Sequence, residues 1–485
     1  RKVIPNRSKP DFTTLETDIL ILGAGLAGFS AAMAASRQAP AASLILVSPA
    51  SGPTGSSFSG PGALGVAVPE TDEERDGFVR KALEISPPGY IIETLVRVLA
   101  EEAEARLKDL TGTGAVLDSG SNGKAVRRPL CFAPELKIAR VIRNPDLIRR
   151  ECEKRLSSGN FTKLSGCEAI ALISQPGRPP RVHGAILKNR AGEILAVKAA
   201  RTIAAMGGPA PLFALNTAGG QISGFSHALM AEAGVPLSNE GYLQFMWHSM
   251  PAGKFFKISR IAEPGMTVIG PRGKELNPPS AAGNLAAQRS LHCPYAFGRQ
   301  DSLLDRFLFA NLNNSGVVQV NDADGDRRLL SPLAHAANGG AVIDEHGRTG
   351  ARGLLAAGEC AAGMHGANRL GGAMVAAALV FGSRAGGTAA LECRDDAIPA
   401  KTFTSLTVDI LDEREIHAGP ESRPLPPFSA GLHKRVALEG SESLQEALEF
   451  LYERKTSLLG GKEKLSIEGA LLVVRFLLRN RSLSD

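Results

Sequence analysis

The chain has 485 residues, of which 44% are hydrophobic and 21% are charged, and its formal net charge is +6 at pH 7. This length accommodates two or three domains, and this composition is typical of a soluble globular protein. The basic residues form no dense run with interleaved aromatics, so we expect no nucleic-acid partner. The apolar stretch 373–381 is shorter than the ~20 residues that cross a bilayer, so we expect no membrane span.

The six cysteines are scattered, and none are spaced as CxxC or CxxCH. This spacing excludes zinc knuckles, iron–sulfur runs and c-type haem, and we expect no metal site. Scattered cysteines in a large chain are typical of a reducing compartment, which predicts a cytoplasmic protein.

The first elements in chain order form a βαβ unit. Residues 1–15 are predicted to be an arm; 18–22 is an apolar strand, 26–37 an Ala-rich helix and 43–47 a second strand. The Gly/Ser/Pro-rich stretch 49–68 follows this strand directly, which favours a ligand-cradling loop over a flexible one.

The middle of the chain alternates helical and strand patterns. Helical periodicity covers 72–112, strands are predicted near 169–173, 182–187 and 194–199, and 202–208 is predicted to be a strand that ends in paired glycines. Residues 221–234 are predicted to be a helix. The irregular, Pro- and Gly-rich part, 250–330, predicts a separate cap.

The last third returns to apolar elements. Residues 353–358 are predicted to rejoin the nucleotide fold, and a buried helix should run from 373 to about 391. A Pro-rich linker at 423–427 then leads to two amphipathic helices, at 430–457 and 464–480.

Three glycines at the first strand–helix junction predict nucleotide binding. Gly23 permits the tight turn, Gly25 lets the backbone approach a pyrophosphate, and Gly28 lets helix and strand pack closely. The N-terminus of the helix then favours the phosphate charge. Ser48 stands where an acidic ribose ligand is usual, so an NAD dehydrogenase fits less well than a flavoprotein.

Further segments make the resemblance specific. The chain resembles the flavoprotein family of L-aspartate oxidase and the flavin subunits of fumarate reductase and succinate dehydrogenase. The segments that carry this resemblance are GAGLAG at 23–28, VSPASGPTGSSF at 47–58, MGG at 206–208, LQF at 243–245, HAANGG at 335–340, LLAAGE at 354–359 and HGANRLGG at 365–372.

The resemblance implies an α/β fold, with a doubly wound, Rossmann-like FAD-binding domain, an inserted cap and a helical C-terminal domain. The expected divisions are an arm at 1–15, an FAD-binding domain at 16–244 and 336–395, a cap at 245–335, a linker at 396–427 and the helical domain at 428–485. The loop at 52–58 lacks the family's flavin-linking His, which implies FAD bound without a covalent bond.

The resemblance also implies roles for individual residues. Cofactor contacts are expected at Gly23, Gly25, Gly28, Ser48, Ser56, Ser57, Gly207, Gly208, Gly358, Glu359, Ala373 and Met374. His335 and Arg369 match residues that hold a substrate carboxylate, and the planar fork of an Arg suits that role. Arg306 aligns with a cap Arg proposed to transfer a proton. The alternatives are a surface ion pair for Arg306 and a structural role for His335, and His365 either bonds the flavin or shapes its turn.

Several positions depart from the family pattern. Met246 stands where a substrate-binding His is usual, and His248 is its candidate replacement. Ala373 and Met374 replace an amide and a hydroxyl that face the flavin, and Phe225 interrupts the GDG pattern. We still expect FAD binding with these changes, whereas the identity of the substrate stays open.

The leading hypothesis is an FAD-dependent oxidoreductase of the L-aspartate oxidase type. It would transfer hydride from a small amino or carboxylic acid to the flavin, with oxygen, fumarate or a separate electron carrier as acceptor. A soluble fumarate reductase-like flavoprotein with a different, less polar substrate is the alternative, favoured by Met246 and Trp247. The third hypothesis is a non-catalytic flavoprotein that binds FAD for assembly with a larger complex.

Overall fold

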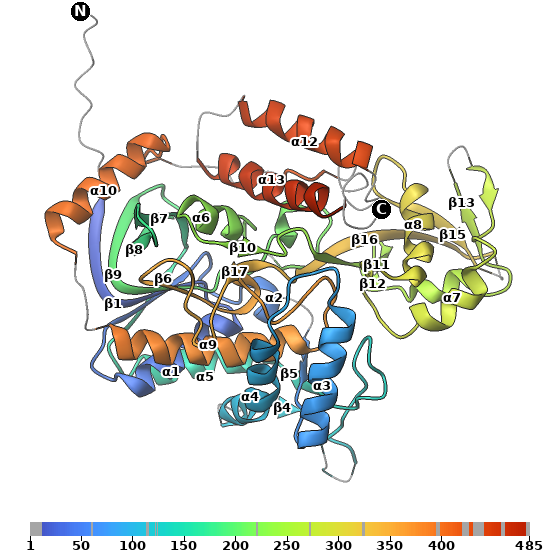
Figure 1. The fold of residues 1–485 in the computed structure, drawn as a ribbon, viewed down its shortest axis with the longest axis horizontal. Coiled ribbons are helices and arrows are strands. Elements are labelled where there is room, and N and C mark those ends of the chain that lie inside the picture. The colour runs from blue at the N-terminus through green and yellow to red at the C-terminus, as the bar shows by residue number, and fades with distance from the viewer. Residues whose placement is uncertain are drawn as a thin grey trace, which may run out of the picture.

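The computed structural model describes residues 12–59, 62–112, 116–121, 123, 125–219, 222–270, 273–322, 325–393, 398–419, 426–429, 441–456 and 461–481. Figure 1 shows an elongated molecule in which the nucleotide fold occupies one end and the cap the other. The expected α/β architecture, with a capping sheet and C-terminal helices, is confirmed.

A seven-stranded sheet forms the centre of the nucleotide fold. Its order is β6-β2-β1-β9-β8-β7, and β18 pairs with the second half of β9. The buried run from Ile19 to Leu22 explains the central place of β1, because a strand covered on both faces reads as continuously apolar. The strands are β1 (Thr13–Leu22), β2 (Leu44–Ser48), β6 (Phe161–Ser165), β7 (Cys167–Gln175), β8 (Arg181–Asn189), β9 (Ile194–Ala204) and β18 (Leu354–Ala356).

Helices from both ends of the chain pack on this sheet. Helix α1 (Leu26–Gln38) lies against α9 (Ala373–Glu392), with α5 (Pro145–Leu156) beside it (Figure 1). Gly386 permits this contact, since a Cβ there would lie 2.1 Å from the carbonyl oxygen of Ala31. Within the described residues, α9 is the one helix long and apolar enough to cross a membrane, but most of it is buried in the core.

Smaller elements complete this part of the fold. Two helices, α3 (Asp72–Ile85) and α4 (Glu93–Thr111), pack on each other and project from the body in Figure 1. The others are α2 (Gly55–Phe58) and α6 (Ser226–Glu232), a sheet of β3 (Ala63–Ala67), β5 (Ala139–Arg143) and β4 (Val116–Leu117), and a sheet of β10 (Leu237–Ser238), β17 (Gly340–Val342) and β19 (Ala361–Ala362).

The cap is more regular than its composition predicts. An antiparallel sheet of order β12-β11-β16-β15-β13-β14 crosses a region expected to be irregular. Its long strands, β11 (Leu243–Met250) and β16 (Arg327–Ala337), run out from the nucleotide fold as a pair. The remaining elements are β12 (Lys254–Phe255), β13 (Thr267–Ile269), β14 (Glu275–Leu276), β15 (Val318–Asn321), α7 (Ala282–Arg289) and α8 (Leu303–Ala310).

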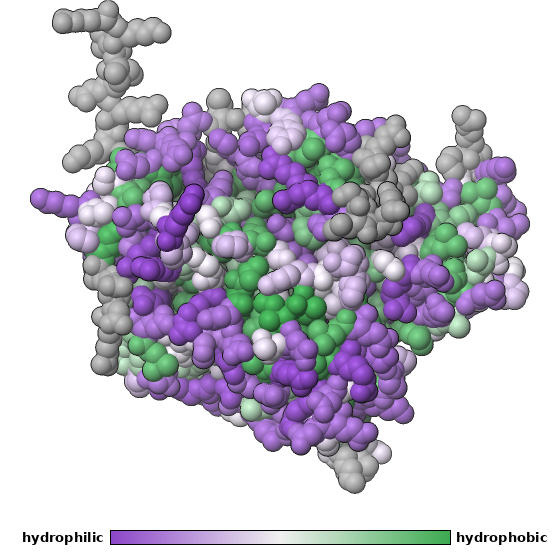
Figure 2. Space-filling view, in the orientation of Figure 1, coloured by the Kyte–Doolittle hydropathy of each residue, from purple (hydrophilic) through white to green (hydrophobic). Residues whose placement is uncertain are grey.

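The C-terminal helices share a core with the cap. Helices α12 (Ser441–Thr456) and α13 (Gly461–Arg481) pack together, and side chains such as Val474 join the cluster that contains Trp247. On the face seen in Figure 2, apolar side chains gather near the centre, between α13 and α3, within a mostly hydrophilic surface.

Two expected non-regular segments contain regular structure. Strand β1 begins at Thr13, inside the predicted arm, because it continues its pairing with β9 to that residue; residues 1–11 lie outside the described part. Helix α10 (Ala400–Glu413) lies inside the predicted linker. It buries Phe403 and Ile410 against β7, which explains why this segment is not a simple connection.

Candidate functional site

A cavity of about 830 Å³ opens between the glycine turn after β1, the loop after β2, the inner ends of β11 and β16, and the start of α9. This volume lies within the range of ligand pockets, about 300–1,000 Å³. Its wall combines backbone-rich glycine segments with few charged side chains, as expected for a site that holds a large, partly apolar ligand.

The glycine turn gives the cavity an anion-binding end. Gly23 has φ +113°, and a Cβ there would lie 2.2 Å from the carbonyl oxygen of Ala205. Helix α1 starts at Leu26 on the cavity wall, and it has no acidic residue in its first turn. Backbone N–H groups and the helix dipole therefore favour a phosphate here. Ser57 lies at the same end, where its Oγ accepts a hydrogen bond from Leu26 N (3.2 Å).

Two more glycine segments bring a carboxyl group to the wall. Gly207 has φ +80°, and a Cβ on Gly208 would lie 2.3 Å from Oε1 of Glu359. The same Oε1 accepts a hydrogen bond from Ala337 N (2.7 Å). Burial raises the pKa of Glu359, which makes this carboxyl a hydrogen-bonding group suited to hydroxyls.

Arg369 is the cationic group of the cavity. It is the single Lys or Arg among the described lining residues. Its Nη2 donates to Oε1 of Gln244 (2.6 Å), and its Nη1 is buried with no hydrogen-bond partner. Burial lowers the pKa of Arg369 to about 10, so the guanidinium remains charged at neutral pH. A buried charged donor without a partner predicts an anionic ligand.

Two histidines face the same cavity from neighbouring strands. Nδ1 of His335 lies 2.9 Å from Oγ1 of Thr217, and Nδ1 of His248 lies 3.0 Å from the carbonyl oxygen of Met246. Burial, with the charge of Arg369 adding to it, lowers the pKa of His335 to about 4. His335 is therefore neutral at pH 7 and offers a hydrogen bond, not a charge.

Most of the expected site residues meet here, and four do not line the cavity. The lining residues that the sequence predicted are Gly23, Gly25, Ser56, Ser57, Gly207, Gly208, His248, His335, Gly358, Glu359, Arg369 and Met374. Gly28 packs helix on strand, as its place in the motif predicts, since a Cβ there would lie 1.9 Å from Gly23 O, and it does not line the cavity. Ser48 is buried and donates to Ala50 O (2.7 Å), and Ala373 is buried beneath the wall. Arg306 is exposed on α8 and does not line the cavity.

His365 and Phe225 also have definite places. His365 is buried away from the wall, and its Nε2 has no partner. Its place away from the wall favours the turn-shaping role, and burial and the charge of Arg369 hold its pKa well below the ordinary value. Phe225 lines the cavity.

The sequence did not single out five residues that the structure places on the wall or beside it. Gln244 orients Arg369, Thr217 pairs with His335, and the hydroxyl of Thr54 is buried on the wall without a partner. Cys131 and Cys293 lie together on the same wall. Gln244 and Thr54 lie inside the segments LQF and 47–58 that carry the resemblance, whereas Thr217, Cys131 and Cys293 had no such signal because their contacts join positions far apart in sequence.

Comparison with known proteins decides the family. A family model described as the FAD binding domain matches residues 18–292 and 314–375, more than half of the chain. The chain belongs to this family. It is a distant relative of L-aspartate oxidases and of the flavoproteins of fumarate reductase and succinate dehydrogenase. These findings support an FAD-dependent oxidoreductase.

Individual relatives agree with this placement. The chain is 28% identical to a fumarate reductase (CoM/CoB) subunit of Methanothermobacter marburgensis over 413 residues, which cover 77% of this chain and 72% of that protein. It is 28% identical to the L-aspartate oxidase of Halobacterium salinarum over 418 residues, 80% of this chain and 78% of that one. The fold matches Mycobacterium smegmatis Sdh1 with a TM-score of 0.71 at 21% identity, covering 98% and 88% of the two chains.

The residues present fit FAD. The glycine turn and the start of α1 would hold the pyrophosphate, and Glu359 would accept from ribityl or ribose hydroxyls. The buried Thr54 hydroxyl, which lacks a partner in the protein, supplies one more polar contact on the wall. The unpartnered Nη1 of Arg369 is left for a second, anionic molecule.

Proposed function

We propose that the chain is an FAD-dependent oxidoreductase that holds a small amino or carboxylic acid by one carboxylate at Arg369. The observation that carries this proposal is the buried, unpartnered Nη1 of Arg369 on the cavity wall. A carboxylate there would form a charge-assisted hydrogen bond and remove the cost of the unpaired buried donor.

The neighbouring side chains would orient that carboxylate. Gln244 fixes the guanidinium through Nη2, and His335, neutral at pH 7, offers a hydrogen bond without a second charge. Bound FAD supplies the chemistry, as the acceptor or donor of a hydride. The protein's part is to hold the acid, exclude water and keep the flavin in place through contacts that we propose are non-covalent.

An L-aspartate oxidase reaction is supported by the relatives that carry this name and by the aligned segments, and L-aspartate is the first substrate to test. A second candidate is a fumarate reductase-like reaction on a less polar acid. Met246 and Phe255 on the wall favour it, because Arg369 alone among the described lining residues can pair with a carboxylate as a permanent cation. Trp247, which the sequence also suggested, does not line the cavity; it is buried and donates to Asp305. The proposed acceptor is oxygen, fumarate or a separate electron carrier.

The test is an anaerobic half-reaction. The FAD-loaded protein is mixed with L-aspartate, and the absorbance of oxidised flavin is followed; bleaching supports the aspartate reaction. L-Alanine, which has one carboxylate, and succinate, which has no amine, are the comparison compounds. Bleaching by none of these acids, and no reoxidation of reduced flavin by fumarate, would contradict the proposal. Release of all flavin on acid precipitation would support non-covalent binding.

A further inference from the structure

Cys131 and Cys293 form a close pair on the cavity wall. Their Sγ atoms lie 3.5 Å apart, within hydrogen-bond distance for sulfur, and both thiols are free and half-buried. Cys131 lies between β4 and β5 of the nucleotide fold, whereas Cys293 follows α7 in the cap. The pair therefore spans the junction of these two parts, 162 positions apart in sequence.

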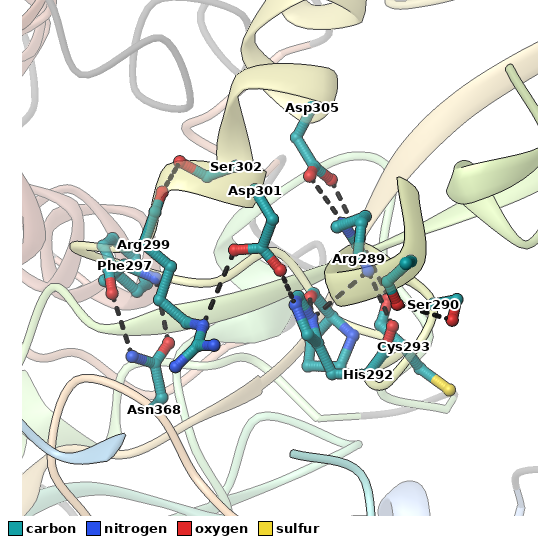
Figure 3. A network of polar contacts seen from close by, with 12 residues as sticks. Arg289, Ser290, His292, Cys293, Phe297, Arg299, Asp301, Ser302, Asp305 and Asn368 are labelled. Atoms are coloured by element: carbon teal, nitrogen blue, oxygen red, sulfur yellow. Dashed lines mark hydrogen bonds and ion pairs between the residues drawn. The ribbon is translucent and has the colours of Figure 1, made fainter. Parts of the chain in front are cut away.

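A buried ionic network fixes the segment that carries Cys293. Arg289 makes two hydrogen bonds to Asp305, at 2.7 and 2.9 Å, and both side chains are almost fully buried. The same guanidinium donates to the carbonyl oxygens of His292 (2.6 Å) and Cys293 (3.3 Å). Figure 3 shows the Sγ of Cys293 pointing away from this network, which leaves the sulfur available to the pair.

A second set of contacts fixes Cys131 against the same segment. Phe132 N donates to the carbonyl oxygen of Leu291 (3.0 Å), and the ring of Phe132 stacks on His292 with centroids 4.3 Å apart. On its other side Cys131 packs against the Arg369 loop, since a Cβ on Gly371 would lie 2.9 Å from Cys131 N. These contacts hold the two sulfurs near each other.

The surroundings of Cys131 favour a thiolate. The hydrogen bond with Cys293 lowers the pKa of Cys131, and the charges of Arg289 and Arg369 add to this effect. Burial opposes this effect at Cys131 without reversing it, and it raises the pKa of Cys152 to about 11 and that of Cys360 to about 12. A thiolate is the reactive form in thiol–disulfide exchange, so Cys131 is the nucleophile of the pair.

We propose that Cys131 and Cys293 are a redox-active dithiol that exchanges with low-molecular-weight disulfides and, when oxidised, joins the cap covalently to the nucleotide fold. The Cys131 thiolate attacks one sulfur of the small disulfide and releases the first thiol. Cys293, on losing its proton, attacks the Cys131 sulfur of this mixed disulfide and releases the second thiol. One S–S bond breaks and one forms, and the small disulfide gains the two electrons and two protons that the pair loses.

Oxidation would change the site in two ways. The cap segment after α7 would be tied to the loop beside Gly371, which restrains movement of the cap over the cavity. The negative charge of the Cys131 thiolate near Arg369 would disappear, leaving this guanidinium freer to hold an anion. The disulfide itself forms by chemistry that does not depend on which acid the enzyme uses, so its test stands apart from that of the proposed function.

The test is a redox titration of the full chain with its bound FAD. The protein is equilibrated with glutathione at increasing ratios of oxidised to reduced form, quenched in acid, alkylated and digested. Mass spectrometry should show Cys131 and Cys293 losing free thiol together in one two-electron transition, with a linked peptide. The buried thiols of Cys152 and Cys393 serve as internal controls and should stay reduced throughout.

Single variants separate the two roles. Cys293→Ser should trap glutathione on Cys131, because the resolving thiol is gone, whereas Cys131→Ser should lower the modification of Cys293 at least ~10-fold. Cys152→Ala should leave the linked peptide unchanged. The flavin-to-protein ratio of each variant reports that it is folded. The proposal is overturned if folded wild-type protein forms no Cys131–Cys293 link at any ratio, or if Cys131 stays unmodified in Cys293→Ser.

Discussion

Replacement of Arg369 by Met tests the anion site most directly. Met is an unbranched apolar side chain that removes both the charge and the unpartnered Nη1. A hydrogen bond to a charged group contributes about 1.5–3 kcal/mol, and about 1.4 kcal/mol corresponds to a factor of ten. Arg369→Met should therefore weaken the binding of a small carboxylate by about 10- to 150-fold.

The assay is a titration of oxidised, FAD-loaded protein with succinate, followed by the change in flavin absorbance. Arg97→Met is the matched control, because Arg97 is an exposed cation on α4 that pairs with Glu93 outside the cavity. The dissociation constant of succinate for Arg97→Met should match that for the wild type. An unchanged constant for Arg369→Met with full flavin occupancy would refute the assignment of Arg369, whatever the substrate is.

Three further outcomes are expected. Gly23→Ala should lose bound flavin and unfold at lower temperature than the wild type, because its Cβ would clash with Ala205 O. The flavin-to-protein ratio and a thermal melt measure these effects, and full flavin occupancy in the variant would contradict the prediction. Burial lowers the pKa of His183 to about 4, so the contribution of its neutral form to stability is present above about pH 6.5 and is lost as pH falls towards 4. In denaturant unfolding between these pH values, His183→Gln should reduce the slope of the unfolding free energy against pH by about 1.4 kcal/mol per pH unit. An unchanged slope would contradict this prediction. Arg289→Met should destabilise the cap by about 3–5 kcal/mol, because Asp305 becomes a buried charge without its cationic partner. The fluorescence of the single Trp reports cap unfolding. The double variant Arg289→Met with Asp305→Asn should recover part of the lost stability.

The sequence predicted the parts of the site that local chain geometry determines. Gly23 and Gly25 could be assigned because a tight turn between a strand and a helix leaves few alternatives to glycine. Arg369 was recognisable inside a long, specific segment. The cofactor and the division into nucleotide fold, cap and C-terminal helices are what the family resemblance carried by these motifs implies.

The rest depends on contacts between distant positions. Nothing local to Arg306 shows that its face of α8 points to solvent. Ser48 ends β2 at the expected place, but its hydroxyl donates to Ala50 O instead of facing the cavity. The sequence does not show which of these two directions the side chain takes. The sequence does not predict the order in the cap because its strands alternate with Pro- and Gly-rich turns. Their pairing is determined by distant partners, such as Leu243 with Ala337, 94 positions away.

The anion site and the cap are built as one unit. Asn368, next to Arg369, accepts from Phe297 N and donates to Phe297 O in the cap, both at 2.9 Å, and it also donates to Ile85 O of the nucleotide fold (2.9 Å). Figure 3 shows this residue beside the Arg289 network. Moving the cap away would break the two bonds to Phe297 and expose a loop whose guanidinium is now buried. The buried state of Arg369, on which its affinity for an anion depends, is therefore coupled to the docked position of the cap, and the Cys131–Cys293 pair lies at that same junction.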